Sequence, residues 1–274
     1  GVVGVGYLGK FHAEKYAGLS GAELTGVYDA DPATARTIAA GLNVPACSCL
    51  DELLDRVDAV SVVVPTESHY AIAKKCLEHG VDVLVEKPIT ATVEEADELI
   101  AAAESAGRIL QVGHLERFNA AVLALDDILV KPMFIESHRL APFKDRGTDV
   151  DVILDIMIHD IDIILTIVGA PVTQVHAVGV PVLSRDKNDI ANVRIEFETG
   201  CIANITASRI SLKEMRKLRV FQTNTYLSID YAAQHVDVYR KISSSDTSEM
   251  PEITYDQIEI TQHDALNEEI RSFV

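Results

Sequence analysis

The stretch of sequence that decides the fold is Gly4-Val5-Gly6-Tyr7-Leu8-Gly9, a GxGxxG pattern. It ends the apolar run Gly1–Val5 and opens the amphipathic segment Lys10–Leu19, so the glycines lie at a strand-to-helix turn. In such a turn one glycine permits the tight bend, the next lets backbone N–H groups approach a pyrophosphate, and the third lets the helix pack closely on the strand. The pyrophosphate then lies at the positive end of the helix dipole. The stretch therefore predicts a dinucleotide site.

Asp29 indicates which dinucleotide binds. It follows the second apolar run, Leu24–Tyr28, twenty positions after Gly9, where an acid hydrogen-bonds the adenosine ribose hydroxyls. The alternative is a solvated aspartate in a turn, but the register with the glycines favours the ribose contact. The same carboxylate would repel a 2′-phosphate, and the neighbours Ala30 and Asp31 bring no arginine. NAD is therefore expected rather than NADP.

The first part of the chain alternates short valine-rich runs with amphipathic segments, which is typical of a doubly wound parallel sheet. The expected strands are Gly1–Val5, Leu24–Tyr28, Ala59–Val64, Val81–Val85 and Ile109–Val112. The expected helices between them are Lys10–Leu19, Pro32–Gly41, Ser68–Glu78 and Val93–Ala106. We therefore predict an α/β fold whose first domain, residues 1–115, is a Rossmann dinucleotide-binding domain.

The pattern changes in the second part of the chain. Two helices are expected first, and after Pro171 the apolar residues recur at every second position, which predicts antiparallel strands. We therefore predict that residues 116–274 form an α+β domain with a large antiparallel sheet, which binds substrate and mediates oligomerisation. The expected elements are helices Glu116–Leu129 and Asp151–Val168, a hairpin of Val193–Phe197 with Ala203–Ala207 about Thr199-Gly200, strands Leu227–Tyr231 and His235–Tyr239, and a polar loop Ser243–Glu249.

Composition excludes several classes of function. The 274 residues carry a net charge of −18, which repels nucleic acid. The sequence contains no run of eighteen uncharged apolar residues, so no membrane span is expected. The four cysteines match no zinc pattern and indicate reduced thiols in a cytoplasmic enzyme without a metal. The chain begins inside an apolar run and ends inside the helix-like segment Asp264–Val274, so we expect the natural protein to be longer at both ends.

A polar stripe marks the expected helix Asp151–Val168. Asp151, Asp155, His159, Asp162 and Thr166 recur at steps of four, four, three and four, which places them on one helix face. A solvated helix edge explains Asp151 and Thr166. Asp155 and His159 lie one turn apart, where a carboxylate can orient an imidazole and support its charged form. We therefore take this pair as candidate catalytic residues.

Lys87 is the third candidate. It stands in Val85-Glu86-Lys87-Pro88, directly after an expected strand. A lysine at the carboxyl end of a parallel strand points into the crevice where doubly wound sheets bind ligands. Taken alone, the residue is equally well explained as a surface lysine in a turn.

These motifs together resemble a known family, that of glucose–fructose oxidoreductase and inositol dehydrogenase (Gfo/Idh/MocA). The resemblance spans the chain and rests on Gly4–Gly9, Asp29, Val64-Pro65-Thr66 with His69, Glu86-Lys87-Pro88 and Asp155-x-x-x-His159, in that order. It implies that Lys87, Asp155 and His159 line a substrate site beside the nicotinamide, and that the Lys87–Pro88 peptide is cis. The cofactor-binding residues expected from motif and resemblance are Gly4, Gly6, Tyr7, Leu8, Gly9, Asp29, Pro65, Thr66, His69, Glu86 and Lys87.

The implied activity is oxidation of a secondary hydroxyl of a sugar or nucleotide sugar. His159 is the expected base because an imidazole titrates near neutral pH, and Lys87 is expected to stabilise charge that develops on the reacting oxygen. Asp155 positions either the substrate or the imidazole, and the sequence leaves both roles open. An NAD-dependent glycoside hydrolase and a non-catalytic NAD or sugar sensor are the alternatives; retention of all three residues argues against the sensor.

The segments His114–Asn119 and Arg139–Phe143 look most like the branch of the family that acts on UDP-N-acetyl sugars. This likeness implies UDP-N-acetylglucosamine, oxidised at the 3-hydroxyl, as the substrate. Guanidinium groups bind diphosphates well, although exposed arginines in an acidic protein explain the same residues. The chain departs from common family patterns at Arg146–Asp151, which is not glycine-rich, and at Ala120, where proline is frequent. The candidate substrate-binding residues are Arg117, Asn119, Arg139 and Arg146.

The expected antiparallel sheet also predicts assembly. It presents apolar residues at alternate positions, and two helices are too few to cover both of its faces. An open apolar face of this kind commonly pairs with a second subunit. We therefore expect a homodimer or homotetramer.

Overall fold

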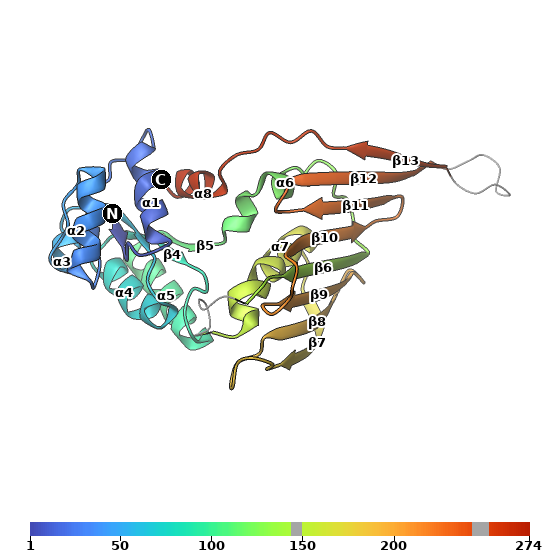
Figure 1. Ribbon diagram of the computed structural model, residues 1–274, viewed down its shortest axis with the longest axis horizontal. Coiled ribbons are helices and arrows are strands. Elements are labelled where there is room, and N and C mark those ends of the chain that lie inside the picture. The colour runs from blue at the N-terminus through green and yellow to red at the C-terminus, as the bar shows by residue number, and fades with distance from the viewer. Residues whose placement is uncertain (144–149, 243–251) are drawn as a thin grey trace. The chain divides into compact units, whose positions relative to one another are not determined.

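A computed structural model describes residues 1–143, 150–242 and 252–274, and the chain divides into two compact units (Figure 1). The first unit consists of Gly1–Leu115 and Asp264–Val274, and the second of Glu116–His263. The last segment thus lies in the first unit, whereas we had expected it in the second domain. The reason is helix α8 (Ala265–Phe273), whose buried Ile270 and Phe273 pack in the core of the first unit. The expected loop 243–249 lies outside the described residues.

The first unit contains a five-stranded parallel sheet in the order β2-β1-β3-β4-β5, as predicted. Its valines are buried on both faces, which explains the continuous apolar runs in the sequence. The strands are β1 Val2–Val3, β2 Val27–Tyr28, β3 Ala59–Val62, β4 Asp82–Glu86 and β5 Leu110–Gly113. The helices are α1 Gly9–Gly18, α2 Pro32–Leu42, α3 Leu50–Leu54, α4 Thr66–Glu78 and α5 Val93–Ala106.

The strand order reverses between β1 and β3, which is the place where doubly wound sheets bind ligands. The glycine segment follows β1 at this switch point, and the segment with Pro65, Thr66 and His69 follows β3. Lys87 follows β4, the next strand along. The topology therefore brings three predicted cofactor segments to one edge of one sheet.

The second unit contains an eight-stranded sheet in the order β13-β12-β11-β10-β6-β9-β8-β7. The pair β6·β9 is parallel and the other pairs are antiparallel, including the predicted β8–β9 hairpin. We did not predict β6, β7, β10 or β13. The strands are β6 Phe134–Leu140, β7 Val172–Val180, β8 Ile190–Phe197, β9 Ile202–Ser208, β10 Met215–Phe221, β11 Thr225–Asp230, β12 His235–Ile242 and β13 Glu252–Gln257.

Both helices of the second unit differ from the prediction. The first is wrong as a continuous helix: a 3-10 turn η1 (Leu115–Phe118) is followed by α6 (Ala120–Leu123). Asn119 separates them because its side-chain oxygen accepts from the Ala121 N–H and starts a new helix there. The second begins with a π turn, η2 (Ile153–Met157), and continues as α7 (Ile158–Val168).

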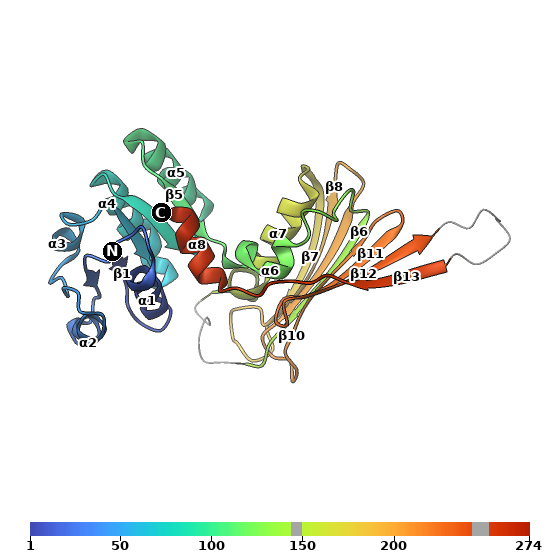
Figure 2. The same cartoon turned by 90° about the horizontal axis from the view of Figure 1, so that it is seen from above.

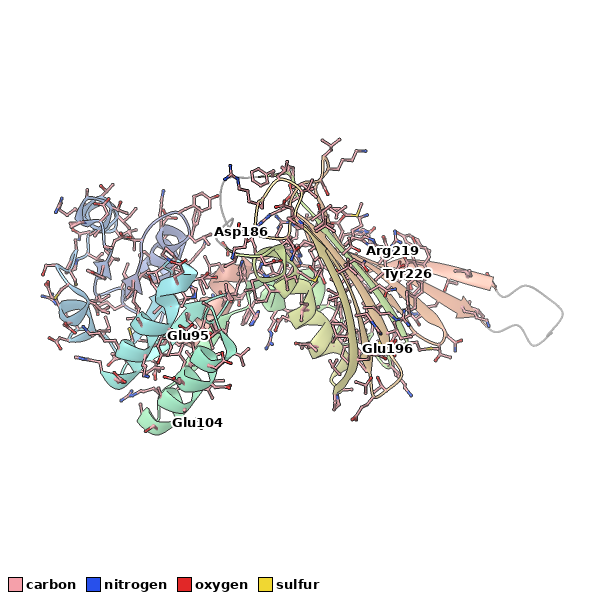
Figure 3. All side chains as sticks on the ribbon, turned by 90° about the horizontal axis from the view of Figure 1, so that it is seen from below. Glu95, Glu104, Asp186, Glu196, Arg219 and Tyr226 are labelled. Carbon is pink, nitrogen blue, oxygen red and sulfur yellow. The ribbon has the colours of Figure 1, made fainter. Side chains whose placement is uncertain are left out.

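One face of the eight-stranded sheet is covered within the second unit. Helices α6 and α7 lie along this face (Figure 2), where Ile163, Ile164 and Met157 pack against inward side chains such as Ile135 and Ile205. The side chains that alternate with these point to the other face. Figure 3 shows Glu196, Arg219 and Tyr226 on the side of the sheet away from α7. No helix among the described residues is long and apolar enough to cross a membrane.

Candidate functional site

The glycine segment has the space that a pyrophosphate needs. Gly4 has a φ of +83°, and a Cβ added there would lie 2.5 Å from the carbonyl oxygen of Val63. A Cβ at Gly9 would lie 1.7 Å from the carbonyl oxygen of Gly4, so this glycine is required where α1 leaves the strand. A Cβ at Gly6 would meet nothing within 4 Å of it in the described residues. Gly4 and Gly9 therefore serve the fold, and Gly6 leaves open room over the loop.

The start of α1 can receive an anion. The residue before it, Leu8, provides no side-chain cap among the described residues, and Tyr7 and Leu8 are both exposed. The first N–H groups of a helix lack intrahelical partners and carry the positive end of its dipole. The residues present therefore fit the pyrophosphate of a dinucleotide.

Asp29 connects the ribose position to the glycine segment. One of its carboxylate oxygens accepts from the Val5 N–H at 2.8 Å, and the other accepts from the Asp31 N–H at 2.9 Å. Each carboxylate oxygen has a further lone pair that can accept from a ribose hydroxyl. The role of turn and helix cap belongs instead to Asp31, which accepts from the N–H groups of Ala33 and Thr34 at the start of α2. The Thr34 hydroxyl and the Ala33 N–H lower the pKa of Asp31.

His69 joins two of the loops at the sheet edge. Its Nδ1 lies 2.7 Å from the carbonyl oxygen of Pro88, and its Nε2 lies 2.8 Å from that of Val64. The ring is buried, and both nitrogens are used inside the unit. His69 therefore holds the segment of Pro65 and Thr66 against the segment after β4, and its contact with the cofactor stays a prediction.

Lys87 is half-buried, and its peptide bond to Pro88 is cis, as predicted. The preceding residue anchors it: the Glu86 carboxylate accepts from the Lys87 N–H at 3.2 Å and contacts His12 Nε2 at 3.1 Å. His12 Nδ1 lies 3.2 Å from Ser61 Oγ, which lies 2.9 Å from the hydroxyl of Tyr16. This buried polar chain was not predicted. Burial raises the pKa of Tyr16 to about 12, so its hydroxyl remains protonated.

Asp155 lies in the π turn η2, and His159 lies in the first turn of α7; both side chains are half-buried. Single π turns within helices are frequent at functional sites. Asp151 starts this segment, because its carboxylate accepts from the Ile153 N–H and from the backbone and side-chain amides of Asn188. Our interpretation of Asp151 as a solvated edge residue was therefore wrong.

A buried ion pair, Asp189 with Arg209, holds the start of the segment that carries Asp155. Asp189 accepts from Arg209 Nε at 2.9 Å, and both side chains are almost fully buried. Arg209 also donates to the carbonyl oxygen of Val150, and Asp189 accepts from the backbone and hydroxyl of Ser184. The loop between β7 and β8 and the end of β9 thereby position the beginning of the helix that carries Asp155.

Arg139, which was predicted to contact phosphate, has its guanidinium group engaged in the core of the second unit. The side chain is buried, its Nε donates to Asp160 at 2.5 Å, and its Nη1 donates to Glu116 at 3.0 Å. Its guanidinium also lies over the ring of Tyr231, 5.2 Å from the centroid. Asp160 accepts a further bond from the Ser137 hydroxyl at 2.6 Å. Arg139 is thus part of a core ion-pair cluster, and we withdraw it as a substrate residue.

The other predicted substrate residues differ in their contacts and in their exposure. The amide of Asn119 caps α6 and donates to the carbonyl oxygen of Tyr231, so it has a structural role and is also withdrawn. Arg117 forms two hydrogen bonds with Asp162, at 2.7 and 2.5 Å, but about half of its side chain is exposed. It can therefore still meet an anion. Arg146 lies outside the described residues.

Comparisons with known proteins agree with this geometry. Residues 1–114 match the model of the Gfo/Idh/MocA oxidoreductase family, NAD-binding Rossmann fold, and residues 133–228 match the model of the Gfo/Idh/MocA C-terminal domain. The first unit is thus an NAD-binding Rossmann domain. A scyllo-inositol 2-dehydrogenase (NAD(+)) of Bacillus subtilis is 30% identical over 77% of this chain and 67% of its own length.

A UDP-N-acetylglucosamine 3-dehydrogenase of Acidithiobacillus ferrooxidans is 39% identical over 100% of this chain and 87% of its own length. A solved structure of that enzyme superposes with a TM-score of 0.93 and covers 99% of this chain and 86% of that one. GenD2 from gentamicin A biosynthesis, solved in complex with NAD, shares the fold at 23% identity and a TM-score of 0.81. The chain therefore belongs to the Gfo/Idh/MocA family and is an NAD-dependent oxidoreductase.

Proposed function

We propose that the protein oxidises the 3-hydroxyl of UDP-N-acetylglucosamine and produces the 3-keto sugar nucleotide. The observation that carries this proposal is the 39% identity along the whole chain to an enzyme of that name, together with the TM-score of 0.93. When bound, NAD would supply a nicotinamide ring able to accept a hydride from the sugar carbon. The chain itself must remove the hydroxyl proton and stabilise the charge that develops on the oxygen.

We assign these two tasks to His159 and Lys87. An imidazole at the first turn of α7 is held by a helix that packs on the sheet, and it can take the hydroxyl proton on one ring nitrogen. The Lys87 ammonium can donate a hydrogen bond to the same oxygen as its charge grows. Asp155 orients either His159 or the sugar.

Recognition of the diphosphate is assigned to Arg117 and Arg146. Arg117 remains half exposed although it pairs with Asp162, and bidentate guanidinium groups are well suited to phosphate oxygens. A chain with a net charge of −18 needs such local donors to accept a substrate with two phosphates.

The substrate test follows NADH formation with UDP-N-acetylglucosamine, free N-acetylglucosamine and an inositol as substrates. We expect kcat/KM to be about a hundredfold higher for the nucleotide sugar, because the free sugar loses the phosphate contacts. Arg117→Gln should lower kcat/KM for the nucleotide sugar selectively, whereas Arg271→Gln, an exposed arginine of α8, should have no effect. Equal rates with the free sugar would reject the nucleotide proposal. Substrate cleavage without net NADH would favour the hydrolase.

We further propose that the uncovered face of the eight-stranded sheet pairs with a second copy of the chain, in a homodimer or homotetramer. Five aromatic side chains lie opposite one another across neighbouring strands of this face, with centroid distances from 4.8 to 5.9 Å. On the same face of β7, Val178 and Val180 are 67% and 47% exposed, although both are apolar. Exposed aromatic and aliphatic side chains of this kind favour self-association. The aromatic row is Phe134, Phe221, Tyr226, Tyr239 and Tyr255.

Charged substitutions in the aromatic row test the assembly. We expect Tyr226→Glu with Tyr239→Glu to convert the oligomer to a monomer, because burying two carboxylates between subunits is strongly unfavourable. Light scattering at micromolar concentration measures the mass. Thr37→Glu on helix α2 of the first unit is the matched control and should leave the mass unchanged. A monomeric unsubstituted protein would contradict the proposal.

We also propose a cytoplasmic location. All four cysteines (Cys47, Cys49, Cys76 and Cys201) are free thiols, as is usual in a reducing compartment. Burial raises the pKa of Cys76 to about 12, which keeps this thiol protonated and unreactive.

A further inference from the structure

Glu269 on α8 is a buried carboxyl group without a hydrogen-bond partner. The residue is 0% exposed, and neither of its carboxyl oxygens has a hydrogen-bond partner within residues 1–143, 150–242 and 252–274. Its backbone oxygen accepts from the Gln111 side chain of β5 at 3.4 Å. A buried carboxylate with neither a donor nor an opposite charge is very unfavourable. The proton state of this group therefore has a physical consequence.

The neighbouring groups of the first unit decide that state. Helix α1 contributes Tyr16 and His12, strand β4 contributes Glu86, and β5 contributes the neutral amide of Gln111. The hydrogen-bonding groups in this region bind Glu86, which accepts from the Lys87 N–H and contacts His12. Burial, together with the nearby Glu86 carboxylate, raises the pKa of Glu269 to about 8. Glu269 is thus the neutral acid, whereas the hydrogen bonds go to Glu86.

We propose that Glu269 is a positioning residue: its protonated carboxyl group allows the Glu86 carboxylate to stay bound at the Lys87–Pro88 segment. If Glu269 loses its proton, the carboxylates of Glu269 and Glu86 repel one another in a region of low dielectric constant. This repulsion favours displacement of Glu86 from the Lys87 N–H. Glu86 and Lys87 lie in the predicted cofactor segment at the end of β4, so the displacement weakens NAD(H) binding. The inference rests on that assignment and makes no use of the identity of the sugar.

The first measurement is thermal stability against pH. The folded-state pKa of about 8 lies above the ordinary value of 4.5. Between these values the unfolded chain has released the proton and the folded chain has not, so the free energy of unfolding falls as the pH rises to about 8 and changes no further above it. Glu269→Gln is isosteric and has no proton to lose. We expect its Tm to fall less than that of the unsubstituted protein between pH 5 and pH 8.

The second measurement is NADH affinity by fluorescence at pH 7 and pH 9. At pH 9 a group with a pKa near 8 keeps its proton in about one molecule in ten, so the unsubstituted protein is expected to bind NADH up to about tenfold more weakly. Glu269→Gln should bind equally well at both pH values. The control is Glu268→Gln, which alters a partly exposed neighbour bound to Arg271 and should follow the unsubstituted protein in both measurements.

Parallel curves for Glu269→Gln and the unsubstituted protein in both measurements would overturn the inference. A changed Tm profile with an unchanged NADH profile would show a buried proton and overturn the positioning role. If the variant does not fold, the infrared carbonyl band of a protonated carboxyl group in the unsubstituted protein decides: it should be present at pH 7 and lost by pH 9, and its absence at pH 7 contradicts the proposal. None of these measurements uses a sugar, so failure of the proposed substrate is seen separately.

Discussion

Replacement of His159 by asparagine is expected to lower kcat by about a hundredfold or more while NAD affinity stays unchanged. The amide keeps the approximate shape and hydrogen-bonding capacity of the imidazole, but it cannot take the hydroxyl proton. Lys87→Met keeps the length of the side chain and removes the donor, so the developing charge on the oxygen loses a hydrogen bond; a comparable loss, about a hundredfold, is expected. NADH absorbance measures turnover, and calorimetry measures NAD affinity.

The control for these variants lies on the same helix. Thr166 is exposed near the end of α7 and donates its hydroxyl to the carbonyl oxygen of Asp162. Thr166→Val is isosteric and should leave turnover and NAD affinity unchanged. Near-normal turnover of His159→Asn across the pH range would place the base elsewhere. A Lys87→Met variant with a raised KM and an unchanged kcat would limit Lys87 to substrate binding.

The parallel sheet and its helices could be predicted because each element has its own local pattern. Helix α5 begins and ends at the predicted residues, Val93 and Ala106, because Thr92 caps its start and Gly107 adopts a φ of 61° after its end. The short helix α3 (Leu50–Leu54) was missed, since five residues are too few to establish a helical period.

The polar clusters could not be predicted in the same way. A period of 3.6 residues shows which face of a helix is polar, but it does not show which side chain that face meets across the fold. Asp160 lies outside the polar stripe and binds Arg139, 21 positions away; we had assigned Arg139 to the substrate because arginine is common at phosphates. The Gln111 side chain and Glu269 are 158 positions apart, and no local pattern brings them together. Such pairs follow from tertiary packing.

The glycines of the first turn permit a test that separates folding from cofactor binding. Gly9→Ala would place a Cβ 1.7 Å from the carbonyl oxygen of Gly4, a backbone atom that can move only if α1 shifts away from the sheet. We expect the free energy of unfolding to fall by about 3 kcal/mol or more, as for severe overpacking, and NAD binding to fall with it. Thermal or urea denaturation measures the first effect, and calorimetry with NAD measures the second.

Gly6→Ala should have the opposite profile. The added Cβ meets nothing within 4 Å in the described residues, and the φ of Gly6 does not lie in the left-handed region, so alanine is tolerated. Because alanine lowers the entropy of the unfolded chain, the free energy of unfolding should rise by up to about 1 kcal/mol. The same methyl group occupies the room through which the backbone approaches the pyrophosphate, so NAD affinity should fall about tenfold or more. A Gly6→Ala protein that is stable and binds NAD normally would mean that the pyrophosphate does not contact the backbone at Gly6. A protein that is stable but binds NAD weakly would place the cofactor there by an observation independent of the resemblance, because no atom of residues 1–143, 150–242 or 252–274 lies within 4 Å of that methyl group.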